Sequence, residues 1–451
     1  MFTVKEIAQA VGGKLFGNGD IDVAAVSTDT RTIEKGTLFV AVKGERFDGN
    51  DFIAQAAEKG AAAVLSDRAE GADGYDVPVI LVEDTRAAQL ALARYHRNRF
   101  DVKLCGVTGS VGKTSTKDMI FAVLSSGFET LKTEGNFNND IGLPRTLFCL
   151  NEGYGAAVIE MGMSDLGEIS VLSKAACPDC AVITNIGYCH IENLKTRENI
   201  LKAKLEILDG AKEGAPLILC GDDEYLKSVE LADRRVIRYG FGENCDVRAE
   251  NIVHLENGEC FELIAQGKRY KAEVPVSGEH HVLNALAAFC VGCEFGMSAE
   301  EIVPAFMNYQ ASGMRQKTER YGGVTAILDC YNASPTSMKS SLSVLGGVKA
   351  EGRKIAVLGD MLELGEMSEE LHAMVAEDVE KNAQVCFLYG AEMNACAKVL
   401  SQRGFEVYHS TDKPLISEKL AQFIKDGDVL LFKGSRGMRM EEIAESIKNG
   451  R

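Results

Sequence analysis

The chain has 451 residues, a length that exceeds one ordinary hydrophobic core and predicts about two to four domains. Its 46% hydrophobic and 25% charged content is typical of a globular protein, while the net charge of −17 argues against a sequence-independent nucleic-acid binder, which needs a basic face. No apolar run is long enough to span a bilayer and the first residues lack the pattern of a signal peptide, so we expect a cytoplasmic protein without membrane or nucleic-acid partners.

Residues 1–84 are predicted to form a small α/β domain. Two polar loops, at 27–31 and 43–48, flank its strands and carry Asp, Lys and Arg side chains. Such loops are usually solvated turns, but two of them in one small domain indicate an anionic ligand. The predicted elements are helices at 4–11 and 51–59, strands at 36–42, 61–65 and 77–82, and a helix at 85–100 that leads into the next domain.

A glycine-rich turn, Gly106-Val-Thr-Gly-Ser-Val-Gly-Lys-Thr114, lies between a predicted buried strand at 102–107 and a predicted helix at 115–126. Such a turn directs backbone N–H groups and the positive end of a helix at one point, which favours a phosphate. Lys113 would reach the β- and γ-phosphates, and the Thr114 hydroxyl would bind Mg²⁺. The strict phosphate-loop pattern has glycine where this chain has Val107, so the alternative is a strand-to-helix turn without a ligand.

Two further candidate residues follow strands of the same domain, which we expect to extend over 85–312. Glu160 ends an apolar strand at 156–160, where a Mg²⁺ ligand belongs in sheets of this kind. His190 comes shortly after a strand at 180–186, although a lone histidine is more often structural.

The rest of this domain combines loops, hairpins and helices. The asparagine-rich loop at 133–144 could present side-chain amides. Lys202 and Lys204 lie on a predicted helix at 197–208, where an exposed lysine in a salt bridge is the ordinary interpretation. Short β segments at 236–276 predict hairpins, and a helix opens near 277.

Thirteen cysteines, an odd number, are scattered through predicted strands and helices. Reduced buried thiols explain this distribution better than a disulfide framework. Two C-x-x-C pairs, Cys177 with Cys180 and Cys290 with Cys293, leave a four-cysteine zinc site as an alternative.

The last part, 313–451, alternates strands and helices, which predicts a parallel, doubly wound sheet. It has no G-x-G-x-x-G after its first strand, so a dinucleotide-binding role is not expected. Polar loops at 329–335, 359–365 and 433–436 follow its strands and predict a ligand at that edge of the sheet. The strands are predicted at 324–330, 354–358, 385–388, 405–408 and 429–432, and the helices near 335–346, 368–381, 392–403, 414–425 and 438–448.

These motifs together resemble the Mur ligases of peptidoglycan synthesis over essentially the whole chain. The family's phosphate loop is normally T-G-x-x-G-K-T, so Val107 is no departure from it. The chain differs at His281, where asparagine usually follows the histidine of the G-x-H element. The matching motifs are, in order, Thr108-Gly-Ser-Val-Gly-Lys-Thr114, Glu160, His190, Ala203-Lys204, Gly278-x-His280 with Asn284, Arg315, and Asp329-x-Tyr331-Asn332.

Within the family, the loops at 136–144, 359–365 and 433–436 look like those of the branch that joins D-alanyl-D-alanine to UDP-N-acetylmuramoyl-tripeptide. The resemblance implies that the tripeptide carboxylate takes the γ-phosphoryl group of ATP, and that the dipeptide amine then attacks the acyl phosphate. Such a transfer depends on positioning and charge neutralisation more than on covalent participation. The resemblance also implies a UDP-binding first domain, a central ATP-binding domain, a Rossmann-like third domain, and roles in cell wall biogenesis, cell shape, cell cycle and cell division. A monomer is the default expectation.

The resemblance also assigns roles to residues. Lys113, Glu160, His190 and Lys204 are the expected catalytic group. Thr114 and Glu160 look like ligands of one Mg²⁺, while His190 and a carbamylated Lys204, now an anion, would hold a second. ATP contacts are expected from Thr108, Gly109, Ser110, Val111, Gly112, Lys113, Thr114, Ser115, His280, Asn284, Arg315, Asp329, Tyr331 and Asn332. Substrate contacts are expected from Ser27, Asp29, Arg31, Lys43, Arg46, Asp48, Asn138 and Asn139.

Other functions stay open at this point. A different Mur-type ligase would add a single amino acid, although the third domain lacks the Asn-Pro-Arg element usual for diamino-acid addition. A folate ligase would have no need of a UDP-binding domain. A nucleotide-dependent regulatory protein would have no need of a second metal position. We also expect the third domain to close over ATP, since an open site would lose the acyl phosphate to water.

Overall fold

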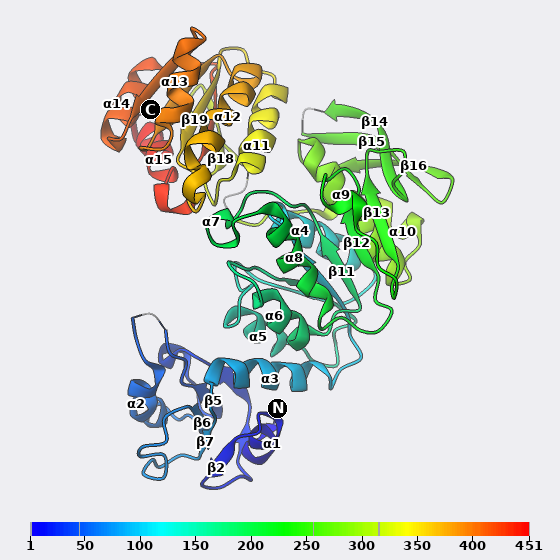
Figure 1. Cartoon of the computed structure of the whole chain (residues 1–451), viewed down its shortest axis with the longest axis vertical. Helices are drawn as coiled ribbons and strands as arrows, with labels where there is room; N and C mark the ends of the chain where they lie inside the picture. Colours follow the sequence, from blue (N-terminus) through cyan, green and yellow to red (C-terminus); the bar gives the residue numbers. More distant parts are fainter. Residues whose placement is uncertain (1, 45, 256, 314–315, 451) are drawn as a thin grey trace.

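The computed structural model describes residues 2–44, 46–255, 257–313 and 316–450. Three bodies of α/β structure follow one another along the chain (Figure 1). The first body lies at the bottom of the view and the third at the upper left, with the second between them. No described helix combines the length and the apolarity needed to cross a membrane.

The first body is built on a five-stranded sheet in the order β2-β7-β6-β5-β4. Strands β4 to β7 are parallel and β2 is antiparallel to β7, while β1 pairs separately with β3. Strands β1 to β4 were not predicted, because two or three residues are too few to show an alternating pattern. The elements are β1 (Phe2–Thr3), α1 (Val4–Ala10), β2 (Lys14–Phe16), β3 (Asp22–Val23), β4 (Ala25–Ser27), β5 (Thr37–Val40), α2 (Ile53–Glu58), β6 (Ala63–Ser66) and β7 (Val79–Leu81).

The central body holds a nine-stranded sheet in the order β16-β15-β14-β13-β12-β11-β8-β10-β9. Its strands are parallel from β9 to β14, and the predicted hairpins are confirmed as the antiparallel strands β14 to β16. Strand β8 is central, and its residues 104–108 are buried, as expected of a strand covered on both faces. Helices α4 and α9 pack against each other, and α3 packs on α5 and α6.

The bounds in the central body are α3 (Thr85–Arg97), β8 (Lys103–Thr108), α4 (Lys113–Leu124), β9 (Thr130–Lys132), α5 (Gly142–Leu147), β10 (Ala156–Glu160), α6 (Glu168–Ala176), β11 (Cys180–Ile183), α7 (Ile191–Leu194), α8 (Arg197–Leu205), β12 (Leu217–Cys220), β13 (Val236–Gly240), β14 (Val247–Leu255), β15 (Gly258–Ala265), β16 (Lys268–Val274), α9 (Glu279–Glu294) and α10 (Ala299–Ala305). Helix α4 starts two residues before the predicted 115, since Lys113 and Thr114 already form its first turn. Helices α5 and α6 were missed in the sequence.

The third body has a six-stranded sheet in the order β17-β18-β22-β19-β20-β21. Strands β18 to β22 are parallel, as predicted, but the unpredicted edge strand β17 runs antiparallel to β18. The elements are β17 (Lys317–Tyr321), β18 (Val324–Asp329), α11 (Pro335–Gly347), β19 (Lys354–Gly359), the 3₁₀ turn η6 (Gly365–Met367), α12 (Ser368–Asn382), β20 (Val385–Tyr389), α13 (Asn394–Gln402), β21 (Glu406–Ser410), α14 (Lys413–Phe423), β22 (Val429–Lys433) and α15 (Glu441–Gly450).

Candidate active site

The phosphate loop connects the end of β8 to the start of α4. Gly112 precedes the helix with φ 84°, a left-handed conformation that suits glycine. Gly109 faces β11 so closely that a Cβ would overlap the Thr184 hydroxyl. The first N–H groups of a helix have no acceptor within it, so the N-terminus of α4 can bind an anion.

Residues after β11 hold this loop from the other side. The Val111 N–H donates to Asn185 Oδ1 at 2.9 Å, and the Val111 carbonyl accepts from the Thr184 hydroxyl at 2.6 Å and from the Asn185 amide at 2.9 Å. These contacts fix the loop before any ligand binds, which lowers the entropy cost of binding. Neither Thr184 nor Asn185 was predicted as part of the site, although their position at the end of a predicted strand could have indicated them.

The Lys113 ammonium lies back over the loop. Its Nζ donates to the Gly109 carbonyl at 2.7 Å and to the Ser110 carbonyl at 3.4 Å. Both acceptors are neutral, so the positive charge remains available to an incoming phosphate.

Thr114 and Glu160 meet at the carboxyl end of the sheet. The Thr114 hydroxyl donates to Glu160 Oε2 at 2.7 Å, and the Asn138 amide donates to Glu160 Oε1 at 2.9 Å. The Glu160 side chain is only 2% exposed. Asn138 therefore orients this carboxylate, in addition to lining the cavity described below.

His190 caps the N-terminus of α7 with φ 61°. Its Nδ1 lies 2.7 Å from Glu363 Oε2, which belongs to the third body. Burial lowers the pKa of His190, and the neighbouring Glu363 carboxylate offsets only part of that effect. The imidazole is thus held neutral, the form in which histidine binds metals.

Lys204 is buried in α8, whereas Lys202 is exposed. Burial, and to a smaller extent the Lys113 charge, holds the pKa of Lys204 well below its usual value. The charged or ionisable neighbours that affect its pKa are the Lys113 ammonium and the Cys189 thiol, and no carboxylate is among them. A buried lysine without a carboxylate partner favours the neutral amine, which is a nucleophile.

A chain of hydrogen bonds crosses from α4 through α9 to Gln316, where the third body begins. The Thr116 hydroxyl donates to Asn284 Oδ1 at 2.8 Å. His281 Nε2 donates to Gln316 Oε1, and the Gln316 amide donates to His280 Nε2, each at 3.1 Å. The residue that departs from the family pattern, His281, thereby links the two bodies.

Acid is expected to weaken the protein through His281. Burial lowers the pKa of His281 from 6.5 to about 4. Between these values the unfolded chain binds more protons than the folded one, so stability falls as the pH falls, by up to about 3 kcal/mol. Thermal unfolding from pH 7 to pH 4 should therefore show a smaller loss in His281→Asn than in the unchanged protein. Equal losses in both proteins would contradict this assignment.

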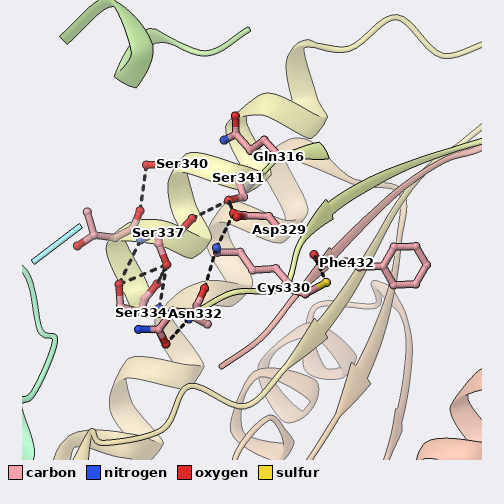
Figure 2. Close-up of polar contacts among 12 residues, drawn as sticks. Gln316, Asp329, Cys330, Asn332, Ser334, Ser337, Ser340, Ser341 and Phe432 are labelled. Atoms are coloured by element: carbon pink, nitrogen blue, oxygen red, sulfur yellow. Dashed lines mark hydrogen bonds and ion pairs between the residues drawn. The ribbon is translucent and has the colours of Figure 1, made fainter. Parts of the chain in front are cut away.

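The third body contributes a buried ion pair. Lys433 Nζ donates to Asp329 Oδ2 at 2.6 Å and to the Asn332 carbonyl at 3.1 Å. The Ser341 hydroxyl also donates to Asp329 Oδ2, at 2.6 Å, as Figure 2 shows. Asp329 and Asn332 are thus held at the end of β18, where ligands were predicted. Lys433 was noted in the sequence only as part of a polar loop.

A cavity of about 900 Å³ lies between the central and third bodies. It brings together most of the predicted nucleotide and metal residues. Buried Lys204 is not part of its wall, and neither are Thr108 and Gly109. Arg315 lies outside the described residues. The predicted residues on its wall are Ser110, Val111, Gly112, Lys113, Thr114, Ser115, Asn138, Asn139, Glu160, His190, His280, Asn284, Asp329, Tyr331 and Asn332.

The predicted contacts of the first body lie away from this cavity. Asp29 accepts two hydrogen bonds from the Arg31 guanidinium at Oδ2, at 2.7 and 3.1 Å, and Asp48 pairs with Arg68. Ser27 donates to the Asp29 carbonyl at 3.2 Å, while Arg46 is exposed. None of the described residues of this body lines the cavity.

One side chain connects the first body to the asparagine-rich loop. Arg86 of α3 donates to the Lys43 carbonyl at 2.9 Å and to Asp140 Oδ2 at 2.8 Å. Asp140 directly follows Asn139, so the loop at 43–48 is tied to the edge of the cavity.

The cysteines form no zinc cluster among the described residues. All thirteen are free thiols, and the described residues contain no group of three or more His, Cys, Asp or Glu side chains able to hold a metal. Cys180 lies instead beside Cys105 on the paired strands β11 and β8.

Comparison with known proteins gives matches over nearly the whole chain. The Mur ligase family, catalytic domain, matches residues 22–97, the Mur ligase middle domain 107–292, and the Mur ligase, glutamate ligase domain, 314–436. A UDP-N-acetylmuramoyl-tripeptide–D-alanyl-D-alanine ligase of Bacillus subtilis is 41% identical over 99% of this chain and 98% of its own. The ligase of the same name from Escherichia coli is 35% identical, with the same coverage.

Solved structures agree with these matches. A crystal structure of MurF from Acinetobacter baumannii has a TM-score of 0.92 at 30% identity, covering 99% of both chains. The MurF ligase of Thermotoga maritima in complex with ADP has a TM-score of 0.85 at 30% identity, covering 96% of this chain and 98% of that one.

The phosphate loop lines a cavity that a second body closes, and the full-length matches place the chain among the ATP-dependent, ADP-forming ligases. The phosphate loop, the strand-end carboxylate and all strands of the third body fall within the matched regions. The chain belongs to the Mur ligase family.

Proposed function

We propose that this protein joins D-alanyl-D-alanine to UDP-N-acetylmuramoyl-tripeptide with the hydrolysis of ATP to ADP and phosphate, in peptidoglycan precursor synthesis. The observation that carries the proposal is the cavity that brings the phosphate loop, Glu160 and His190 opposite Asp329 and Asn332 of the third body. The full-length similarity to ligases with this activity supports the choice of substrates.

In this reaction the tripeptide carboxylate attacks the γ-phosphorus of ATP and ADP leaves. The dipeptide amine then attacks the acyl phosphate carbon, loses a proton and expels phosphate. Lys113 and the N-terminus of α4 would bind the phosphates and offset the charge that develops on them. Asn284 and His280 would lie near the adenine or ribose, with the predicted Arg315 and Asp329, Tyr331 and Asn332 closing from the third body.

The residues present fit one Mg²⁺ at Thr114 and Glu160. A hydroxyl and a carboxylate 2.7 Å apart supply the hard oxygen ligands that Mg²⁺ prefers. When bound, the ion would neutralise charge on the phosphate oxygens.

A second Mg²⁺ would be held by His190 together with a carbamylated Lys204. An ammonium at Lys204 would repel a cation, but its carbamate would supply oxygen ligands. Carbamylation consists of attack by the neutral amine on CO₂ with loss of one proton, and the lowered pKa of Lys204 favours that neutral amine.

Substrate binding by the first body is also part of the proposal. The loops at 27–31 and 43–48 would bind the UDP group, and Asn139 with Asn138 would contact the muramoyl peptide.

The domain limits of 84 and 312, a cytoplasmic location and a monomeric state stay predictions, as does closure of the third body on ligand binding. Small-angle scattering that shows no compaction with an ATP analogue and UDP-N-acetylmuramoyl-tripeptide would argue against closure.

Phosphate release tests the proposed reaction directly. The protein is incubated with ATP, Mg²⁺ and UDP-N-acetylmuramoyl-tripeptide, and with D-alanyl-D-alanine, single amino acids or no acceptor. Release that requires the dipeptide is expected. Release with a single amino acid would favour the alternative of another Mur-type ligase, and release without any acceptor would contradict a ligase.

A further inference from the structure

The loop that follows β19 in the third body contacts the loop of His190 in the central body. Glu363 Oε2 lies 2.7 Å from His190 Nδ1. The backbones touch as well, because the Glu192 N–H donates to the Glu363 carbonyl at 3.3 Å. A Cβ on Gly365 would lie 3.3 Å from Glu192 Cα. The side-chain contact therefore rests on a backbone contact between the two loops.

Both partners have backbone conformations that non-glycine residues rarely adopt. His190 has φ 61° and Glu363 has φ 64°. Each such conformation is strained for a residue that carries a side chain, and it persists only where the surrounding structure holds it. Residues held in this way occur often at functional sites.

The base of the Glu363 loop is fixed within the third body. The Met361 N–H donates to Nε2 of the buried His372 at 2.9 Å, and the Leu362 N–H donates to the Ser435 hydroxyl at 2.8 Å. Glu363 itself is exposed, but the two residues before it are anchored. A hydrogen bond from a neutral imidazole to an exposed carboxylate adds little stability, so stability alone does not explain this arrangement.

We propose that Glu363 is a positioning residue for His190. By accepting the Nδ1 proton, the Glu363 carboxylate leaves the lone pair of His190 on Nε2 and fixes the plane of the ring. Carboxylates that hold a metal-binding histidine in this manner strengthen metal binding. This inference rests on the proposed function, in which His190 holds the second Mg²⁺, and it makes that site depend on the placement of the third body.

Binding of Mn²⁺ tests this role without any turnover. Mn²⁺ is titrated into the full-length protein with a non-hydrolysable ATP analogue, and bound ion is measured by electron paramagnetic resonance. We expect the weaker Mn²⁺ site to lose about 10–100-fold in affinity in Glu363→Ala. Glu363→Gln should recover part of the loss, because its amide oxygen accepts the same proton. Glu366→Ala, an exposed carboxylate on the adjoining turn, is the matched control and should bind like the unchanged protein.

His190→Ala separates the two proposals. Loss of one Mn²⁺ site in His190→Ala but not in Glu363→Ala would overturn the positioning role and leave the proposed function intact. An unchanged site in His190→Ala would overturn the proposed metal role of His190. Equal losses in Glu363→Ala and Glu366→Ala would mean that loop charge alone is responsible, and this too would overturn the inference.

Discussion

Lys204→Ala is expected to lower kcat by about 10²–10³-fold, the range seen when one group that stabilises transition-state charge is removed. The lysine is buried, and burial lowers the pKa of Lys204, which favours the neutral amine that reacts with CO₂. Without the carbamate, the second metal would lose an anionic ligand. Phosphate release with saturating substrates measures the effect, and Lys202→Ala, an exposed lysine on the same helix, should retain full activity.

Two further measurements identify the modification itself. Protein equilibrated with ¹³C-labelled bicarbonate should show one carbamate carbon signal that is absent from Lys204→Ala. A small carboxylate such as acetate should restore part of the activity of Lys204→Ala, because it can supply oxygen ligands in the space that the side chain leaves. Full activity of the unchanged protein after thorough removal of CO₂, together with no labelled signal, would refute carbamylation.

Lys113→Ala should lower kcat/KM for ATP by about 10³-fold. Among the described residues its ammonium donates to the neutral carbonyls of Gly109 and Ser110, so its charge is available to the β- and γ-phosphates. As ADP departs, negative charge builds up on the oxygen that bridged the β- and γ-phosphates, and Lys113 stabilises that charge. The decrease in activity should therefore appear in kcat as well as in KM.

The matched control for Lys113→Ala is Lys174→Ala, an exposed lysine on α6 that does not line the large cavity. Calorimetry with ADP gives an independent readout and should show weaker binding for Lys113→Ala only. Activity of Lys113→Ala within tenfold of the unchanged protein would exclude the proposed role in phosphate binding.

The candidate site could be predicted where a short segment carries its own geometry. Gly112-Lys113-Thr114 combines the turn, the helix start and the charge in consecutive residues, and the structure places all three on the cavity. Glu160 could be predicted because it is the first charged residue after an apolar stretch, which marks the carboxyl end of the strand, where ligands bind in such sheets. The same logic located Asp329 at the end of β18.

Contacts between distant segments could not be predicted. Asn185 and Thr184 hold the phosphate loop, and Lys433 holds Asp329 across 104 positions of sequence. Edge strand β17 was not predicted, because its residues are mostly polar and show no alternation of apolar and polar side chains. Its pairing with β18 became evident only in the structure.

By itself, the amino-acid sequence determined the class of the fold and the kind of ligand, because strand periodicity, helix starts and the phosphate loop are local properties of neighbouring residues. The tertiary structure alone decided that Lys204 rather than Lys202 is buried, that His281 meets Gln316, and that His190 faces Glu363. Burial and electrostatic environment depend on segments that are far apart in the chain, and pKa values, tautomers and ion pairs follow from that environment.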